Sequence, residues 1–314
     1  MRNSTTKNLE CKKVAWITDD IYLKHDTGVG HPESVDRLIS INLKVASLKD
    51  KLIEVEPRFA TKEEVEMVHD PKLISYIEAK SIEETPVDPD TRLSKESYLS
   101  ALKAVGAGLV AIDGIKEGKF ERAFCAVRPP GHHATPEQSM GFCLFNNIAI
   151  TARYAQKHGY KKVMIVDFDV HHGNGTQDTF YADDTVLYFS THQAYAFPGT
   201  GAWADTGRDR GEGYTVNLPL MPDSGDDEIL EYYHEDLPKH YNSFDPDIVL
   251  VSAGYDLHES DPLAQLNVTT DGIRQIVREI LDLGDTPVIF MLEGGYSVTD
   301  LGWNVVATLE EMFE

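Results

Sequence analysis

The sequence has few cysteines and no long apolar run. Its 314 residues include three cysteines, Cys11, Cys125 and Cys143, and none forms a CxxC pair. This excludes a disulfide framework and predicts a reducing compartment, in which Cys125 and Cys143 fill apolar space. No stretch reaches the roughly 18 apolar residues that a membrane span needs, and the amino-terminal residues lack the apolar core of a signal peptide. We therefore expect a cytoplasmic protein with no membrane partner.

Basic residues are also scarce. The chain has 29 Lys and Arg against 52 Asp and Glu, a formal net charge of −23. Phosphate binding requires clustered Lys and Arg, so this composition excludes a nucleic-acid partner. A negative field instead favours the approach of cationic substrates such as lysine-rich peptides or polyamines.

No repeat, low-complexity tract or Pro/Ser/Gly-rich linker divides the chain. We therefore expect a single domain over residues 13–314, preceded by a disordered or loosely attached segment, residues 1–12. The sequence leaves the oligomeric state open.

Short apolar, β-branched runs alternate with helical patterns. Residues 97–117 and 271–283 carry apolar side chains at helical spacing, with Thr269 or Thr270 as a cap of the second helix and Gly284 as its stop. Strands that alternate with helices indicate the α/β class, with a mostly parallel sheet covered by helices on both faces. The predicted strands are 14–18, 122–127, 163–169, 185–191, 214–220, 247–254 and 287–295.

Residues 161–175, KKVMIVDFDVHHGNG, are the most informative segment of the chain. The apolar run looks buried on both faces, so the charged residues at its end are not an ordinary solvated strand end. Side chains alternate along an extended strand, which places Asp167, Asp169 and His171 on one side. Two carboxylates and an imidazole in a row predict a metal site.

A catalytic zinc has three protein ligands and an open position for water. Asp169 and His171 supply two ligands, and the third must come from another loop. Asp256 is the best candidate because it follows a buried strand, and Asp261 is its competitor. Open α/β sheets bind their ligands outside the carboxyl ends of the strands, where these residues are expected to meet.

Two adjacent histidines, His132 and His133, form a second candidate unit in RPPGHHAT. One can take a proton from a water while the other steadies charge, provided that partners such as Asp167 and Asn174 fix their tautomers. Tyr296 follows two glycines that permit a close backbone approach, and its hydroxyl can stabilise a developing oxyanion.

The motifs RPPGHHA, GFCLFNN, VDFDVHHGNGTQ, FPGTG, VSAGYD, DPL and LEGGY, in this order, resemble those of the histone deacetylase family, specifically its class II branch and bacterial relatives. The resemblance spans about residues 13 to 305. It implies a single-domain arginase/deacetylase fold with about eight strands and the active site at their carboxyl ends. It also implies zinc-dependent hydrolysis of an acyl amide on a lysine-like amine.

The same resemblance implies roles for individual residues. Zinc would be held by Asp169, His171 and Asp256, and Tyr296 would polarise the amide carbonyl. His133 would be the main general base and acid.

His132, hydrogen-bonded to Asp167, would then act mainly as an electrostatic partner. Asn174 occupies the position of the partner of His133; class I proteins tend to have Asp there, so the resemblance implies a less basic His133.

The resemblance further implies a narrow tunnel for the acyl-lysine stem. Phe142, next to Gly141, and Phe197 would form its walls, while Asp88 or Asp90 would grip the substrate backbone at the rim. Burying the four-methylene stem would contribute ~3 kcal/mol. Arg37 matches an interior arginine of the family.

Family members also bind a structural K⁺ or Na⁺ through the backbone of the metal loop. Its expected surroundings are Asp167, Asp169, His171, Ser190 and Thr191.

Two positions limit the range of substrates and activities that the resemblance implies. Polyamine-specific members of the class II branch carry Glu where this chain has Leu263, so the resemblance favours acyl-lysine in a protein or peptide or another singly charged substrate. Tyr296 is kept where the weakly active class IIa proteins have His, which implies catalytic competence.

Other readings of the sequence are hydrolysis of acetylpolyamines or other small amides, a catalytically silent acyl-lysine scaffold, and a dinuclear manganese ureohydrolase.

Overall fold

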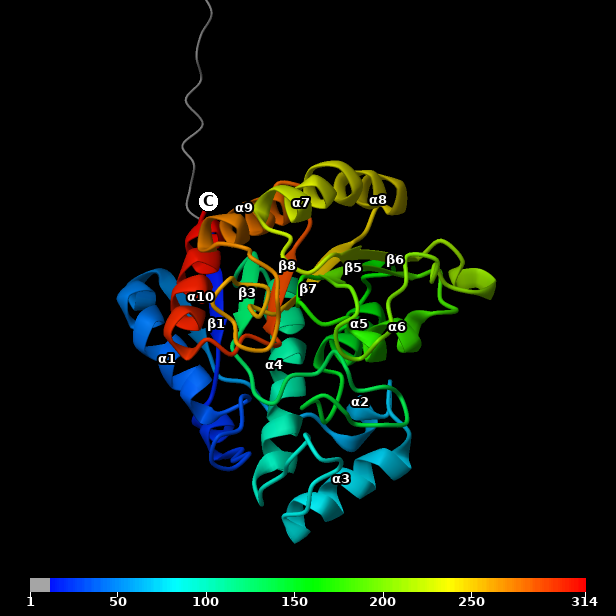
Figure 1. Ribbon diagram of the computed structural model, residues 1–314. Coiled ribbons are helices and arrows are strands. Elements are labelled where there is room, and N and C mark those ends of the chain that lie inside the picture. The colour runs from blue at the N-terminus through cyan, green and yellow to red at the C-terminus, as the bar shows by residue number, and fades with distance from the viewer. Residues whose placement is uncertain (1–11) are drawn as a thin grey trace, which may run out of the picture.

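The computed structural model describes residues 12–314, and its core is one sheet of eight parallel strands. Their order across the sheet is β2-β1-β3-β8-β7-β4-β5-β6, so the chain begins near one edge and later crosses to build the other half (Figure 1). The strands are β1 (Val14–Ile17), β2 (Leu52–Val55), β3 (Arg122–Cys125), β4 (Val163–Asp167), β5 (Val186–Gln193), β6 (Thr215–Leu220), β7 (Ile248–Ala253) and β8 (Val288–Leu292).

Helices cover both faces of this sheet. On one face α4 packs on α5 and against β1, β3 and β8, while α1 and α9 both pack on α10 in the opposite layer (Figure 1). The helices are α1 (Val35–Val45), α2 (Lys62–Val65), α3 (Pro71–Glu83), α4 (Ser97–Lys116), α5 (Asn147–Lys157), α6 (Asn174–Phe180), α7 (Asp226–Glu231), α8 (Leu237–Phe244), α9 (Thr270–Leu281) and α10 (Val298–Met312). Short 3-10 helices at Asp20–Lys24, Ala46–Lys51 and Asp209–Gly211 and a π-helical turn at Tyr232–Asp236 complete the set.

The predicted α/β class and parallel sheet are confirmed. All seven predicted strands form, and the inner ones, such as β4 and β7, are buried along their whole length. The eighth strand, β2, was missed because LIEV is only partly buried at the sheet edge and has no continuous apolar signature. Thr269 caps α9 as predicted by accepting a hydrogen bond from the N–H of Gly272, although the helix ends at Leu281, before Gly284.

Helix α4 is the one helix of residues 12–314 that is long and apolar enough to cross a membrane. Its most apolar window is 83% buried inside the protein, which identifies it as a core helix. Glycine and alanine let it approach its neighbours closely: a Cβ on Gly106 would meet the carbonyl oxygen of Arg58 at 1.7 Å.

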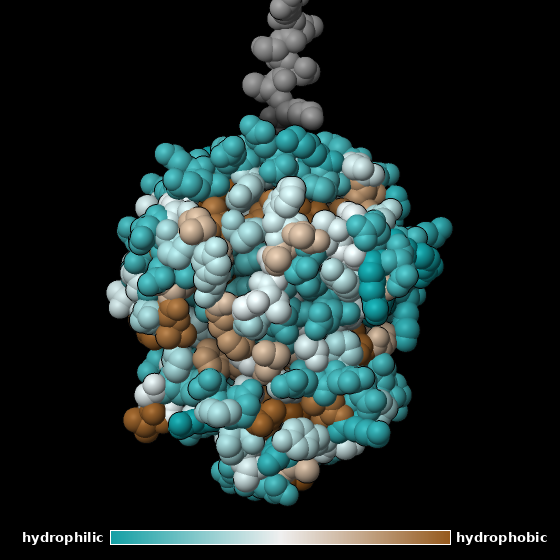
Figure 2. Space-filling model, turned by 45° about the vertical axis from the view of Figure 1, so that its right-hand side comes forward, coloured by the Kyte–Doolittle hydropathy of each residue, from teal (hydrophilic) through white to brown (hydrophobic). Residues whose placement is uncertain are grey.

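The predicted loose segment, residues 1–12, lies outside the described residues apart from Lys12, whose N–H donates to the carbonyl of Phe313. Cys11 also lies outside them. Cys125 and Cys143 are both fully buried free thiols, in agreement with their predicted packing role. One face of the molecule, seen in Figure 2, is mainly hydrophilic, with apolar side chains in small separate groups.

Candidate active site

The loops that follow five neighbouring strands meet at the carboxyl edge of the sheet. They follow β3, β8, β7, β4 and β5, which are adjacent in the strand order, so their polar residues converge although they are distant in sequence. This is the position at which open parallel sheets bind ligands.

One detail of the predicted metal row is wrong. Strand β4 ends at Asp167, so Asp169 and His171 are not part of the strand. The N–H of Asp169 donates to Asp167 Oδ1 at 3.1 Å, and the N–H of His171 donates to Asp169 Oδ1 at 2.9 Å. These turns bend the chain out of the sheet. Phe168 and Val170 stay buried, so apolar side chains and the polar site residues still alternate along the chain beyond the end of the strand.

Asp169, His171 and Asp256 come together at the end of β4 and β7. One ligand atom from each lies within 4.8 Å of the others, and His171 Nδ1 is 3.2 Å from Asp169 Oδ1 and 3.0 Å from Asp256 Oδ2. Both carboxylates are fully buried. Glycine backbone surrounds them, because a Cβ at Gly254 would lie 2.0 Å from Asp169 Oδ2 and one at Gly294 would lie 2.1 Å from Asp256 Oδ2.

The electrostatics of this group fit a cation. Burial and the neighbouring Asp169 carboxylate raise the pKa of Asp256 to about 7. Burial opposes the charged form of Asp169 as well, but His132 and His171 outweigh it and lower the pKa of Asp169. Buried carboxylates this close need a positive charge between them. Two carboxylates and one imidazole are hard and borderline ligands that suit a divalent ion such as zinc.

Asp261, the competing candidate for the third ligand, does not join this group. Its Oδ2 accepts hydrogen bonds from the N–H groups of Tyr296 at 2.6 Å and Ser297 at 3.3 Å, and its Oδ1 accepts from Leu263 N–H at 2.9 Å. Asp261 therefore positions the backbone of Tyr296.

The two histidines lie side by side, with ring centroids 4.0 Å apart, and each has its own partner. His132 Nδ1 lies 3.1 Å from Asp167 Oδ2, which also accepts the hydroxyl proton of Tyr188 at 2.9 Å. His133 Nδ1 lies 2.9 Å from the Oδ1 of Asn174 at the start of α6 and donates to it. This bond leaves His133 Nε2 without a proton and available as an acceptor.

Their surroundings separate the pKa values of the two rings. Burial alone would lower the pKa of His132, but the carboxylates of Asp169, Asp167 and Glu293 outweigh it and raise the pKa to about 10. Burial and the neighbouring His132 and His171 hold the pKa of His133 well below its usual value. The raised pKa favours a charged His132, as an electrostatic partner requires. The lowered pKa favours a neutral His133, as a base requires.

Glu293, at the end of β8, is a fully buried residue that the sequence analysis did not select. Its Oε2 accepts the N–H groups of Gly131 at 2.6 Å and His132 at 3.1 Å, so it fixes the loop that carries both histidines. The sequence signal was a glutamate directly after a buried strand. The hydroxyl of Tyr188, which holds Asp167, had no such signal.

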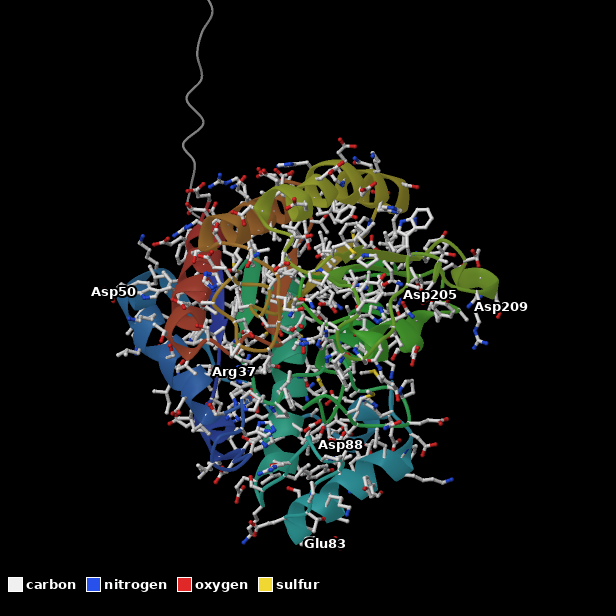
Figure 3. The ribbon with its side chains drawn as sticks, in the orientation of Figure 1. Arg37, Asp50, Glu83, Asp88, Asp205 and Asp209 are labelled. Atoms are coloured by element: carbon white, nitrogen blue, oxygen red, sulfur yellow. The ribbon has the colours of Figure 1, made fainter. Side chains whose placement is uncertain are left out.

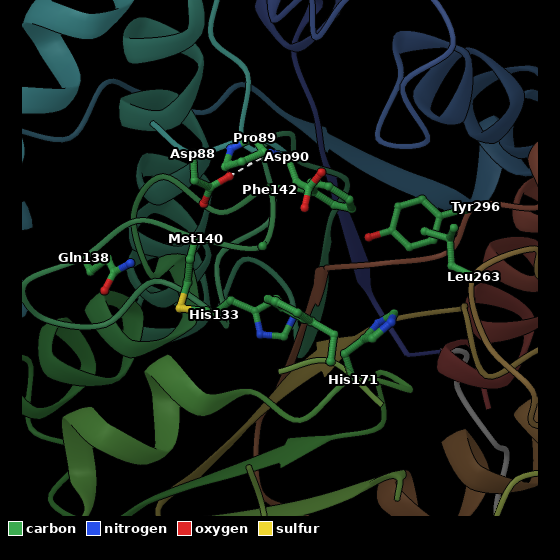
Figure 4. Close-up of a pocket in the computed structure, with 12 residues that line it drawn as sticks. Asp88, Pro89, Asp90, His133, Gln138, Met140, Phe142, His171, Leu263 and Tyr296 are labelled. Atoms are coloured by element: carbon green, nitrogen blue, oxygen red, sulfur yellow. Dashed lines mark hydrogen bonds between the residues drawn. The ribbon is translucent and has the colours of Figure 1, made fainter. Parts of the chain in front are cut away.

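A cavity of about 360 Å³ leads to this group from the surface (Figure 4). His133 and His171 lie at its base, with Tyr296 on one side, where its hydroxyl points into the cavity (Figure 4). Phe142 meets Tyr296 edge to face at 5.8 Å, and Phe197 meets His133 at 5.0 Å. The cavity is lined by Asp88, Pro89, Asp90, His133, Gln138, Met140, Gly141, Phe142, His171, Phe197, Leu263 and Tyr296. Pro89, Gln138 and Met140 were not selected from the sequence.

Gly141 has a specific steric role in this wall. Its φ is +57°, and a Cβ there would lie 2.6 Å from His133 Cδ2 and 2.9 Å from Phe197 Cε1. Only glycine permits that approach, which seats the imidazole against the tunnel wall.

The two rim aspartates differ in their contacts. Asp88 Oδ1 accepts from the N–H groups of Asp90 at 2.9 Å and Thr91 at 2.6 Å, and its Oδ2 accepts from the Thr91 hydroxyl, so Asp88 builds the turn near α3 (Figures 3 and 4). The carboxylate of Asp90 has no hydrogen-bond or ion-pair partner among residues 12–314. Leu263 is 44% exposed and lies across the cavity from Asp88, on the side of Tyr296 (Figure 4).

Two further predicted groups lie just behind the site. Ser190 and Thr191 are buried in β5, and Ser190 pairs with Asp167 of β4 in the sheet register. Arg37 is fully buried, binds Glu33 at 3.0 Å and the carbonyl of Gly295 at 2.6 Å, and its guanidinium lies 5.0 Å from the ring centre of Tyr296.

A sequence model of the histone deacetylase domain matches residues 31–312. The chain belongs to the histone deacetylase family. It is therefore a deacetylase-type hydrolase, and its family implies a metal cofactor and acylated substrates.

Individual relatives agree with this assignment. A probable deacetylase of Archaeoglobus fulgidus is 37% identical over 285 residues, which cover 88% of this chain and 79% of that protein. The chloroplastic histone deacetylase 10 of Oryza sativa subsp. japonica is 40% identical over 295 residues, which cover 88% of this chain and 67% of that protein. Human histone deacetylase 9 is 36% identical over 322 residues, but the match spans only 32% of its length.

Among solved structures, the crystal structure of the HDA15 HD domain superposes with a TM-score of 0.92 at 36% identity. The match covers 96% of this chain and 88% of that one. The arginase/deacetylase fold expected from the sequence is thereby confirmed.

Proposed function

We propose that the protein is a zinc-dependent amidohydrolase that removes acetyl or related acyl groups from lysine side chains of peptides or proteins. The observation that carries this proposal is the convergence of the Asp169, His171 and Asp256 ligand group, the base His133 and the hydroxyl of Tyr296 at one narrow, mainly apolar tunnel.

Asp169, His171 and Asp256 would hold the metal ion. A divalent ion there would polarise the amide carbonyl and make a water molecule more acidic. The backbone of Gly254 and Gly294 packs against the two carboxylates, while His171 lines the tunnel, so the position left open for water and substrate faces the tunnel.

The protein's own groups then supply proton transfer. His133 accepts a proton from the attacking water at Nε2, because its Nδ1 proton is bound by Asn174, and returns it to the lysine nitrogen as the C–N bond breaks. His132, charged and held by Asp167, favours the negative charge that develops beside it. Tyr296 donates a hydrogen bond from its hydroxyl to the carbonyl oxygen and stabilises that oxygen as it becomes an oxyanion.

The tunnel supports a lysine-like substrate. Phe142 and Phe197 offer apolar walls to the four methylenes of the stem. The Asp90 carboxylate, which has no partner within the described part of the chain, is placed to accept backbone N–H groups of a peptide, while Leu263 offers no countercharge to a second ammonium.

The second candidate substrate is an acetylpolyamine, favoured by the same Asp90 carboxylate and by the net charge of −23. A direct comparison separates the two: purified protein loaded with zinc is given an acetyl-lysine peptide and acetylspermidine, and acetate release is measured. We expect a higher kcat/KM for the peptide. A preference for acetylspermidine at moderate salt would reject the acyl-lysine assignment.

A structural K⁺ or Na⁺ near Asp167, Asp169, His171, Ser190 and Thr191 is also part of this proposal. It is supported by the pairing of β4 and β5 at Asp167 and Ser190. A cytoplasmic location remains a prediction from the free, buried cysteines and the composition.

A further inference from the structure

Two buried histidines have no part in the proton transfer described above. His172 follows the metal-ligand candidate His171, and His192 lies in β5; each is 1% exposed, and their ring centroids are 4.8 Å apart. Neither lines the tunnel or joins the ligand group. Buried imidazoles need partners for their ring nitrogens, so the partners of this pair show what it holds in place.

One nitrogen of each ring is bound from the body of the protein. His192 Nδ1 lies 2.9 Å from the hydroxyl of Ser190 on the same strand, and His172 Nε2 donates to Gln177 Oε1 of α6 at 3.1 Å. Turning either ring would leave a buried polar group without its partner, which is costly. Strand β5 and helix α6 therefore fix both rings.

The other nitrogen of each ring faces the Phe197 loop, residues 195–201. His192 Nε2 donates to the carbonyl of Gly201 at 2.9 Å, and His172 Nδ1 lies 2.7 Å from the Thr200 hydroxyl. Among the described residues, these are the two hydrogen bonds that join the Phe197 loop to the rest of the chain. The loop therefore depends on the histidine pair for its polar anchors.

Gly201 brings the backbone of this loop onto the two rings. Its φ is +82°, and a Cβ there would lie 2.5 Å from His192 Nε2 and 2.6 Å from His172 Cδ2. Glycine permits both the backbone conformation and the close approach. The end of the Phe197 loop thus rests directly on the histidine pair.

Phe197 itself is 48% exposed and lines the tunnel. The centroid of its ring lies 5.0 Å from that of His133 and 6.3 Å from that of His171. Because nearly half of the side chain is exposed, burial alone holds the ring weakly. The anchors at the end of the loop therefore decide how closely the ring approaches an acyl-lysine stem.

We propose that His172 and His192 are positioning residues that hold the Phe197 loop, so that Phe197 closes on the acyl-lysine stem. The inference rests on the proposed function and identifies what sets the width of its tunnel. The pair acts through Phe197 and contacts no reacting group. Its loss should weaken binding of the stem equally in the ground and transition states and spare the chemistry at His133, which Asn174 holds independently.

The first test measures KM and kcat of full-length, zinc-loaded His192→Leu with an acetyl-lysine peptide. We expect KM to rise about tenfold, because the stem loses contact with one of its two apolar walls, and kcat to change less than about twofold. General damage to the fold gives the opposite pattern, since a smaller active fraction lowers kcat and leaves KM unchanged.

Thr200→Val tests the same anchor from the loop side, at an exposed residue whose substitution should not impair folding. It removes the hydroxyl that meets His172, and KM should rise about threefold. The matched control is Thr206→Val. Its hydroxyl donates to Glu212 at 2.8 Å and the residue does not line the tunnel, so KM should stay unchanged.

A double-mutant cycle shows whether the effect runs through Phe197. Phe197→Ala alone should raise KM by a factor similar to that of His192→Leu. Adding His192→Leu to Phe197→Ala should then raise KM by less than about twofold, because the ring that the histidine positions is gone. An effect carried by Ser190, the other partner of His192, would persist in full without Phe197.

Hydrogen exchange of the Phe197 loop supplies a readout that needs no turnover. Its amides should exchange faster in His192→Leu and in Thr200→Val than in wild type or Thr206→Val, measured without substrate. Unchanged exchange in both loop variants, unchanged KM in both, or a full tenfold effect of His192→Leu in the Phe197→Ala background would overturn the inference. Failure of the proposed function is distinguishable, because then no protein of the set releases acetate while the exchange difference remains.

Discussion

Gly141 offers a sharp steric test of the site, through the substitution Gly141→Ala. The new Cβ would lie 2.6 Å from His133 Cδ2, whereas an ordinary contact begins at 3.4 Å. The His133 ring or the Gly141 backbone must therefore move by about 0.8 Å. A displacement of about 1 Å of a reacting group costs on the order of a hundredfold in rate, so kcat/KM for an acetyl-lysine peptide should fall by tens to a hundredfold.

The substitution also has a backbone cost, because the φ of Gly141 is +57° and a left-handed L-residue costs roughly 1–2 kcal/mol. Gly118→Ala provides the matched control. Gly118 has a φ of +69°, but a Cβ there meets nothing within 4 Å, and the residue lies between α4 and the first residue of β3, at the edge of the sheet opposite the site. The backbone cost should therefore be similar in both variants, and any further loss of stability in Gly141→Ala measures the steric contact.

Acetate release and urea unfolding, measured on both variants, separate the two effects. We expect both variants to stay folded in the absence of urea, with Gly141→Ala losing activity and Gly118→Ala retaining it. Near-normal turnover by Gly141→Ala, or an equal loss of activity in Gly118→Ala, would refute the role given to the contact between Gly141 and His133.

Three further predictions concern the metal, the rim and the pH dependence of stability. Asp256→Ala should lose both bound zinc and activity, whereas Asp261→Ala should keep its zinc; metal analysis of the two variants would show the reverse if Asp261 were the third ligand. Leu263→Glu should shift the ratio of kcat/KM several-fold from acetyl-lysine peptide toward acetylspermidine, since a charge pair at the rim is worth only ~1 kcal/mol. The shift should shrink as the salt concentration rises, because salt screens exposed charges. A ratio that does not change would show that Leu263 has no part in substrate selection. His69 is buried, and burial lowers its pKa from 6.5 to about 4. As the pH falls from 6.5 toward 4, the unfolded chain binds a proton at this residue before the folded protein does, so the free energy of unfolding falls by up to about 3 kcal/mol. Above pH 6.5 both states are neutral at this residue and nothing is lost. Denaturant unfolding across this range should show a shallower pH slope in His69→Gln, and an identical slope in both proteins would contradict the assignment.

The sheet was predictable because its inner strands are buried on both faces and carry continuous apolar runs. The edge strand β2 lacks such a run, since LIEV is half exposed, and only its pairing with β1 makes it a strand. The end of β4 was also misplaced, because the side-chain bonds of Asp167 and Asp169 to the following N–H groups end the strand without glycine or proline.

The convergence of the candidate residues was largely predictable because each follows a strand and the carboxyl ends of parallel strands share one edge. That argument favoured Asp256 and left Asp261 as its competitor, and only the fold shows that Asp261 binds the backbone of Tyr296. Likewise, Asp88 and Asp90 differ in their hydrogen bonds and not in sequence signature. Glu293 was missed because its partners are backbone N–H groups more than a hundred residues away.

Tyr296→Phe provides the most direct test of the central claim that this tunnel hydrolyses acyl-lysine amides. The substitution removes one hydroxyl with little change of shape, and loss of one oxyanion donor costs about a hundredfold to a thousandfold in kcat. The measurement is acetate release from an acetyl-lysine peptide by wild-type and Tyr296→Phe protein, with zinc content determined in the same samples. The account predicts turnover by the wild type and a loss of at least a hundredfold in the variant at equal zinc content. Near-normal turnover by Tyr296→Phe, or no acetate release by zinc-loaded wild type, would contradict it.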